Sequence, residues 1–123
     1  MSAAHEELRA LVQRYARAAD ERDVDALAAL FDPGAEIDGV RGPMPVAAWL
    51  DTMRTPRGGD YSMHMLGDPL IVLDEAAGTA TVDTYGVVYQ PERMLGMRYI
   101  DDVALVEGRW LIRHRRSRAV WSR

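Results

Sequence analysis

The spacing of hydrophobic and polar positions divides the chain into a first part with helical periodicity and a second part with extended runs. Over residues 3–20, apolar side chains recur every three or four positions and charged ones fill the rest of the helical wheel, which predicts an amphipathic helix. Its apolar stripe consists of Leu8, Leu11, Val12, Tyr15 and Ala19. Since helices come first and strands follow, the pattern predicts an α+β fold, with the helices packed on the concave face of a curved sheet.

Two shorter helices are expected after residue 20. Asp23 is predicted to cap the first of them, and the turn-forming sequence Asp32-Pro33-Gly34 would end it. An extended piece over residues 35–38 then leads to Gly42-Pro43, where proline at the first helical position would open the other helix. The apolar faces are Val24, Leu27, Ala28 and Phe31 for the first helix, and Val46, Trp49, Leu50 and Met53 for the second. Residues 55–60 are expected to form a loop.

Four extended runs follow, over residues 61–74, 79–90, 94–106 and 109–121. The short links between them predict that neighbouring strands are antiparallel. Strands of this length are expected to coil strongly, and bends or bulges cost least at Gly67, Pro69, Gly86 and Gly96. The length of the chain fits one domain over residues 1–123.

Composition narrows the possible chemistry. The 123 residues contain no cysteine, and all 15 basic residues are arginine. The first absence excludes disulfides and thiolate nucleophiles, and the second excludes Schiff bases and a phosphate-loop lysine. The three histidines are far apart in sequence and no close pair of ligands occurs, so neither a metal nor another cofactor is expected.

Charge and hydropathy limit the partners in the same way. The net charge of −4 disfavours nucleic-acid binding, and an arginine-rich final strand is typical of a solvated or dimer-contact surface. No apolar run approaches the ~20 residues that span a bilayer, so no membrane partner is expected. The first residues lack the basic and apolar regions of a secretory signal, which predicts a cytoplasmic protein.

Five short strings, taken in order, resemble the SnoaL-like family of the nuclear-transport-factor-2-like superfamily. They are YARAADERDVDAL at residues 15–27, AEIDG at 35–39, HMLG at 64–67, GMRYID at 96–101 and GRWLIRHR at 108–115. The resemblance implies a cone-shaped α+β barrel and a homodimer formed through the outer sheet face. The superfamily includes dehydratases, dehydrochlorinases, epoxide hydrolases, ketosteroid isomerases, polyketide cyclases and members without catalysis, so the fold does not determine the function.

Within this resemblance, Asp20 and His64 match the catalytic pair of the dehydratases and dehydrochlorinases. In those enzymes an aspartate at the end of the first helix orients a histidine, which takes a proton from substrate carbon. Histidine titrates near neutrality, and a carboxylate bonded to one ring nitrogen fixes the tautomer. Tyr15 would donate a hydrogen bond to developing negative charge. The second catalytic histidine of scytalone dehydratase is absent, because Tyr89-Gln90 stands in its place.

Further ligand contacts are expected from five residues. Tyr99 and Asp101 share one face of their strand. Arg115 matches an arginine that helps to stabilise the departing anion in the dehydrochlorinases, although the arginines around it favour a solvated strip. Trp49, on the apolar face of the third helix, and Tyr85, whose strand face the alternation leaves open, complete the expected binding residues.

A second resemblance leads to ketosteroid isomerase, through Arg14-Tyr15 followed by Asp20. In that enzyme a tyrosine and a protonated aspartate hold the oxyanion while another aspartate is the base. Asp101 falls near the oxyanion aspartate. Asp38 falls one residue short of the base position, where Gly39 stands, and a slip of one residue turns a strand side chain to the other face.

The leading hypothesis from the sequence is a cofactor-independent lyase or isomerase that acts on a small, largely apolar molecule. His64 would be the base and Asp20 its orienter. The alternative is a non-catalytic ligand-binding or dimerisation module of the same fold, and a third hypothesis is an isomerase that uses Asp38 with Tyr15 and Asp101. The distance between Asp20 and His64 and their exposure to solvent discriminate between the first two.

Overall fold

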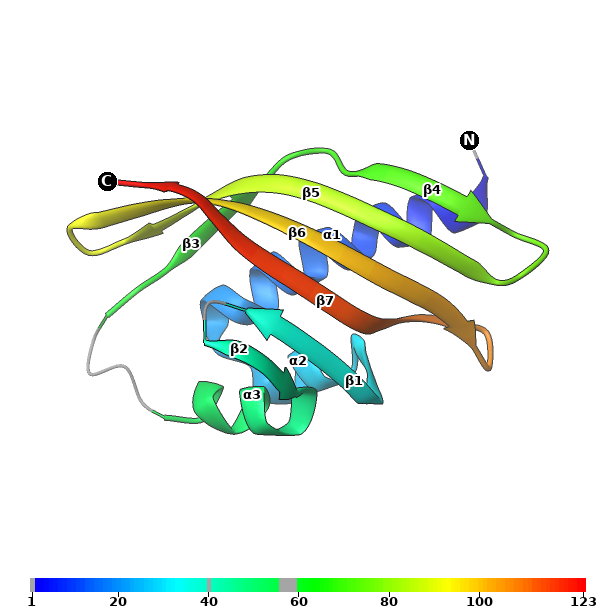
Figure 1. Cartoon of the computed structure of the whole chain (residues 1–123), viewed down its shortest axis with the longest axis horizontal. Helices are drawn as coiled ribbons and strands as arrows, with labels where there is room; N and C mark the ends of the chain where they lie inside the picture. Colours follow the sequence, from blue (N-terminus) through cyan, green and yellow to red (C-terminus); the bar gives the residue numbers. More distant parts are fainter. Residues whose placement is uncertain (1, 40, 56–59) are drawn as a thin grey trace.

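A computed structural model describes residues 2–39, 41–55 and 60–123 of the chain. Three helices precede most of the strands: α1 (Ala3–Glu21), α2 (Val24–Ala28) and α3 (Val46–Met53). The strands are β1 (Phe31–Gly39), β2 (Gly42–Pro45), β3 (Met63–Leu66), β4 (Leu70–Asp74), β5 (Thr79–Gln90), β6 (Arg93–Val106) and β7 (Arg109–Ser122). Figure 1 shows a long twisted sheet with α1 lying across one face, which confirms the predicted α+β fold.

The first helix forms as its amphipathic pattern predicts. The Ser2 hydroxyl accepts a hydrogen bond from the His5 backbone N–H and caps the start of the helix. At the other end, Arg22 adopts a left-handed conformation with φ 52°, and its N–H bonds to the carbonyls of Ala18 and Ala19. The buried face of α1 consists of Leu8, Leu11, Val12, Tyr15, Ala16, Ala18 and Ala19. This face packs on the sheet and closes the core.

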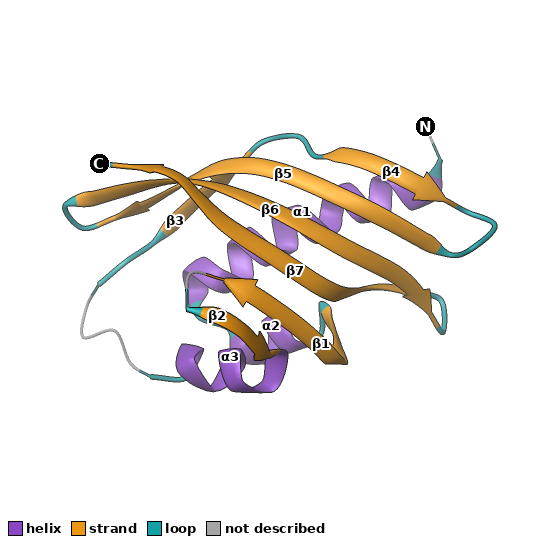
Figure 2. Cartoon of the chain, viewed as in Figure 1, coloured by secondary structure: helices purple, strands orange, loops and turns teal. Residues whose placement is uncertain are grey.

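The sheet is mixed and open. Its strand order is β2-β1-β7-β6-β5-β3, and β4 also pairs with β5. The long strands β5, β6 and β7 are antiparallel neighbours, as predicted, whereas β1 pairs with β7 in parallel. Within the described residues, β2 and β3 form edges rather than closing a barrel. Figure 2 shows these strands as one sheet, in which β2 and β3 lie at the two ends of the strand order.

Two local predictions before the sheet were wrong. Phe31-Asp32-Pro33-Gly34 starts β1 instead of ending α2, because Phe31 pairs with Ile112 of β7 and the Ile112 N–H donates to the Leu30 carbonyl. Gly42-Pro43 starts β2 instead of opening α3, since Gly42, at φ 88°, pairs with Gly39 in a tight hairpin. Strand pairing overrides the local turn and cap signals at both places, with distant β7 at Phe31 and with adjacent β1 at Gly42.

The extended run predicted over residues 61–74 is two strands that share β5 as partner. β3 and β4 are separated near Gly67 and Pro69, where a bend was expected. Gly86 lets β3 approach β5 closely, because a Cβ atom there would lie 2.3 Å from the Leu66 side chain and 2.8 Å from the Met65 carbonyl oxygen. This close approach places His64 of β3 over the interior. Among the described residues, no helix is long and apolar enough to cross a membrane.

Candidate active site

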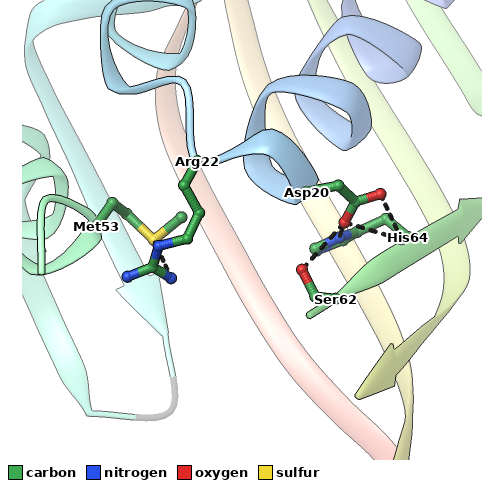
Figure 3. A network of polar contacts seen from close by, with 5 residues as sticks. All are labelled: Asp20, Arg22, Met53, Ser62 and His64. Carbon is green, nitrogen blue, oxygen red and sulfur yellow. Dashed lines mark hydrogen bonds and ion pairs between the residues drawn. The ribbon is translucent and has the colours of Figure 1, made fainter. Parts of the chain in front are cut away.

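The last turn of α1 and strand β3 bring Asp20 and His64 into direct contact (Figure 3). The Asp20 Oδ1 atom lies 2.5 Å from His64 Nδ1, and the His64 backbone N–H donates to Oδ2 at 2.9 Å. The Ser62 hydroxyl donates to Oδ1 at 3.1 Å. One carboxylate thus binds both the ring and the backbone of its partner, and these donors offset the unfavourable position of a negative charge at a helix C-terminus.

This contact determines which ring nitrogen of His64 can act as a base. With Asp20 ionised, Nδ1 carries the proton that it donates to the carboxylate, so the lone pair of the neutral ring lies on Nε2. The side chains are sheltered, with 10% of His64 and 22% of Asp20 exposed. The short distance and the low exposure are what a catalytic pair requires, by the two measures named in the sequence analysis.

Two buried tyrosines lie beside the histidine. The Tyr15 ring meets the His64 ring edge-on, with centroids 5.7 Å apart, and meets the Tyr99 ring at 5.6 Å. Burial raises the pKa of the Tyr15 phenol, and burial raises the pKa of the Tyr99 phenol as well. Both hydroxyls therefore stay protonated near neutral pH and can serve as hydrogen-bond donors.

A buried ion pair completes this group of residues. Arg115 Nε donates to Asp101 Oδ1 at 2.7 Å, and Nη2 donates to Oδ2 at 2.8 Å. The guanidinium lies 3.8 Å from the Tyr15 ring centroid and 4.8 Å from that of Tyr99. Burial opposes the charged guanidinium, but the charge and hydrogen bonds of Asp101 outweigh it, and the pKa of Arg115 stays above its ordinary value.

Arg115 is buried and does not belong to the solvated strip that the surrounding arginines favoured as the competing interpretation. Arg115 pairs directly with Asp101 across β6 and β7, on the sheet face that is covered by α1. Its Nη1 group has no hydrogen-bond partner among the described residues. The hydroxyl of Thr84, opposite Tyr99 on β5, is also buried without a partner there. No sequence signal had singled out Thr84.

Two other predicted residues, Asp38 and Tyr85, lie apart from this group. Asp38 alternates with the buried Ile37 and so points to the other side of β1. Its register partner in β7 is Arg116. The inward position is Gly39, which removes the base that the isomerase hypothesis requires. Tyr85 is 60% exposed on the outer sheet face, where Arg98 lies 5.4 Å over its ring, so its assignment to the interior was wrong.

Trp49 lines a hollow that adjoins the buried group. Its ring lies 5.7 Å from that of Phe31, and the hollow has a volume of about 680 Å³. Ile37 and Ser117 also line it; they pair with Arg115 and Tyr99, respectively. A hollow of about 880 Å³ lies elsewhere, between α1, α2 and the β6–β7 turn, without Asp20 or His64 in its lining. Within residues 2–39, 41–55 and 60–123, no three His, Asp or Glu side chains converge as a metal site.

A protein-family model, described as the SnoaL-like domain, matches residues 1–116. The chain belongs to the SnoaL-like family. A comparison with curated protein sequences found no match. The sequence resemblance to this family is therefore confirmed. The sheet is curved, as the resemblance implies, but among the described residues it stays open instead of closing into a barrel.

Solved structures share the fold of this SnoaL-like domain. A putative scytalone dehydratase from Novosphingobium aromaticivorans is 19% identical, with a TM-score of 0.81, and the match covers 96% of this chain and 85% of that one. A hexachlorocyclohexane dehydrochlorinase of type 2 is 14% identical, with a TM-score of 0.82 and coverage of 98% and 88%. A protein of unknown function with a cystatin-like fold from Nostoc punctiforme is 20% identical, with a TM-score of 0.79 and coverage of 97% and 93%. At these identities the likeness concerns the fold.

Proposed function

We propose that this SnoaL-like domain is a cofactor-independent lyase or isomerase in which His64 removes a proton from substrate carbon. The observation that carries the proposal is the hydrogen bond of Asp20 to His64 Nδ1, which leaves the lone pair of the neutral ring on Nε2. Asp20 also stabilises the imidazolium that forms. A positioned base of this kind contributes about 10²- to 10⁴-fold in rate.

The substrate would be a small, largely apolar molecule with an acidic C–H beside a carbonyl group. Nε2 takes the proton, and the electrons of the C–H bond move to the carbonyl oxygen to form an enolate. Tyr15 and Tyr99 are protonated donors near the ring and stabilise this negative charge. The imidazolium then returns the proton to another carbon in an isomerase, or to a departing group in a lyase.

Deuterium exchange tests the proton-removal step without the natural substrate. We would incubate the protein with 2-tetralone, an aromatic ketone with acidic C–H bonds, in D₂O and follow its α protons by NMR. His64→Ala and Asp20→Asn are expected to lose most of the exchange rate while the protein stays folded. His114→Ala and Asp102→Asn are the matched controls, because they alter a surface His–Asp contact at 3.7 Å. Equal rates in all four variants and the wild type would refute the proposal.

A non-catalytic ligand-binding module is the second candidate. It is favoured by the apolar hollow beside Trp49, whose lining includes neither Asp20 nor His64. For this function, aromatic molecules bind to the hollow, but His64→Ala changes neither their affinity nor any exchange rate. Measured binding of 2-tetralone without deuterium exchange would establish it over the lyase or isomerase.

We also infer that a second copy of the chain covers the outer sheet face. A row across four strands joins Met65, Val87, Gly96 and Trp121, and the indole lies where a Cβ atom of Gly96 would be. Met65 and Trp121 are exposed large apolar side chains, which are typical of an interface. Met65→Arg is expected to give monomers in analytical ultracentrifugation, whereas Leu105→Arg, at an exposed apolar site near the β6–β7 turn, is not. A wild-type monomer would contradict the inference.

A further inference from the structure

Arg22 stands at a position where the backbone favours a different residue. It ends α1 at φ 52°, in the left-handed region that glycine or asparagine adopts at lowest cost. Its backbone N–H closes the helix by bonding to Ala18 and Ala19, and any non-proline residue provides that N–H. The arginine side chain is therefore not needed to form this turn.

In the part of the chain that the structure describes, the guanidinium of Arg22 has only weak or neutral acceptors. Nη2 donates to the Thr55 backbone carbonyl at 2.9 Å, and Nη1 lies 3.9 Å from the Met53 sulfur, which is a weak acceptor (Figure 3). Five acidic residues line a neighbouring hollow with Arg22, namely Asp20, Glu21, Asp23, Asp25 and Asp60. Neither they nor other described carboxylates form an ion pair with its guanidinium. A guanidinium, with its planar set of donors, is thus left with capacity for an anionic acceptor.

The charges around the hollow beside Trp49 have one sign. Arg22 and Arg41 line it, and no described Asp or Glu does, although the chain as a whole carries a net charge of −4. Trp49, Met44 and Met53 supply apolar walls. A volume of about 680 Å³ lies within the range of small-molecule sites. This lining suits a ligand with an apolar, flat body and a negatively charged end.

We propose that Arg22 binds a carboxylate group of the ligand, so that the substrate class is an aromatic or similarly apolar carboxylic acid. The ligand body would extend past Ile37 and Ser117 toward Tyr99 and Arg115, with which these two residues pair. The inference rests on the proposed function, because it takes the hollow beside Trp49, which adjoins the buried group, as the place where the substrate of that function binds. Arg22 acts in recognition and holds the ligand at the opening, while His64 acts on its carbon.

A pair of probes of equal shape tests the charge preference. 2-Naphthoate carries a carboxylate at neutral pH and 2-naphthamide carries a neutral amide in its place. We expect the wild-type protein to bind 2-naphthoate about tenfold more tightly in isothermal titration calorimetry, as a charge-assisted hydrogen bond allows. Added salt should weaken the binding of 2-naphthoate more than the binding of 2-naphthamide.

Arg22→Asn separates recognition from helix capping, because asparagine tolerates the left-handed backbone. The variant is expected to keep its melting temperature and its affinity for 2-naphthamide but to lose the tenfold preference for 2-naphthoate. Arg17→Gln is the matched control, since it removes an arginine that lines the other large hollow. It should leave both affinities unchanged.

Several outcomes overturn the proposal. They are equal wild-type affinities for the two probes, failure of 2-naphthoate to bind, or an Arg22→Asn variant that keeps the preference and is merely less stable. The last result would make Arg22 a helix cap, with its charge opposite the helix dipole as its role. The His64→Ala variant is expected to keep the preference for 2-naphthoate over 2-naphthamide. Loss of deuterium exchange in that variant therefore tests the proposed function and not the role of Arg22.

Discussion

The guanidinium of Arg115 lies 3.8 Å from the ring centroid of Tyr15 while it binds both carboxylate oxygens of Asp101. Three groups that are far apart in the sequence thereby fix one another inside the core. The ion pair cancels its own charge, so the apolar interior contains a strong donor without a net charge. Tyr15 in turn contacts His64, which connects the pair to the proposed base.

The buried pair is expected to respond asymmetrically to substitution. Arg115→Met leaves a carboxylate unpaired in the core and should cost about 3–5 kcal/mol of unfolding free energy, whereas the double change with Asp101→Leu should recover much of this loss. Urea denaturation measures both. Arg98→Gln is the control, because it breaks an ion pair with Asp83 on the outer face and should have a small effect. The expectation would be contradicted if the double variant lost as much unfolding free energy as the two single variants lose together.

Alkaline titration should identify two phenols that resist ionisation. Because the pKa values of Tyr15 and Tyr99 are raised by burial, the folded protein keeps their protons above pH 10, where the unfolded chain releases them. Unfolding then releases protons, so stability falls as the pH rises above about 10. Near-ultraviolet absorbance of phenolate should show that both phenols ionise only when the protein unfolds. Tyr15→Phe and Tyr99→Phe should each remove one of these two late-ionising phenols. Ionisation of all five tyrosines of the chain before unfolding would refute this prediction.

Thr84 offers a test of the unpartnered hydroxyl. The buried Thr84 hydroxyl makes no hydrogen bond among the described residues. Thr84→Val replaces it with a methyl group in a side chain of similar shape, so the stability should stay unchanged or rise by up to about 1 kcal/mol. Val82→Thr, two residues away on the same buried face of β5, should instead cost about 1–3 kcal/mol, since it buries a new hydroxyl. Thermal unfolding compares the two. A marked loss of stability in Thr84→Val would show that its hydroxyl has a partner.

Asp38 should be dispensable for proton removal. Its side chain lies on the far side of β1 from Ile37, so Asp38→Asn is expected to exchange deuterium into 2-tetralone at the wild-type rate. The same assay with His64→Ala supplies the positive control. A large loss in Asp38→Asn, with His64→Ala unaffected, would restore the isomerase hypothesis.

Much of the fold could be predicted because its elements carry their own periodicity. The stripe of α1 and the extended runs that form β5, β6 and β7 depend on local sequence, and the structure confirms them. Phe31 and Gly42-Pro43 were misassigned because their conformation is imposed by partners. Phe31 belongs to β1 through pairing with Ile112, and the turn signals around it describe a helix end equally well.

The candidate site was predictable where family strings mark it. Asp20 and His64 were found through resemblance, because a helical wheel alone leaves Asp20 at the border of the apolar stripe. Arg115 could not be distinguished from the surrounding arginines, since its burial depends on its register with Asp101. Thr84 carries no local signal at all. Arg22 does carry a local signal, because it directly precedes Asp23, the predicted cap of the second helix. Its left-handed backbone, however, is evident only from the structure.

The position of β7 has a consequence for synthesis of the protein. β7 is the last strand in the sequence, yet it lies between β1 and β6 in the sheet. Until residues 109–122 have left the ribosome, β1 and β6 lack the strand that lies between them, and Asp101 lacks its counter-ion Arg115. We therefore expect chaperones to protect the growing chain from aggregation. Its ordered interior should form in one late, cooperative step.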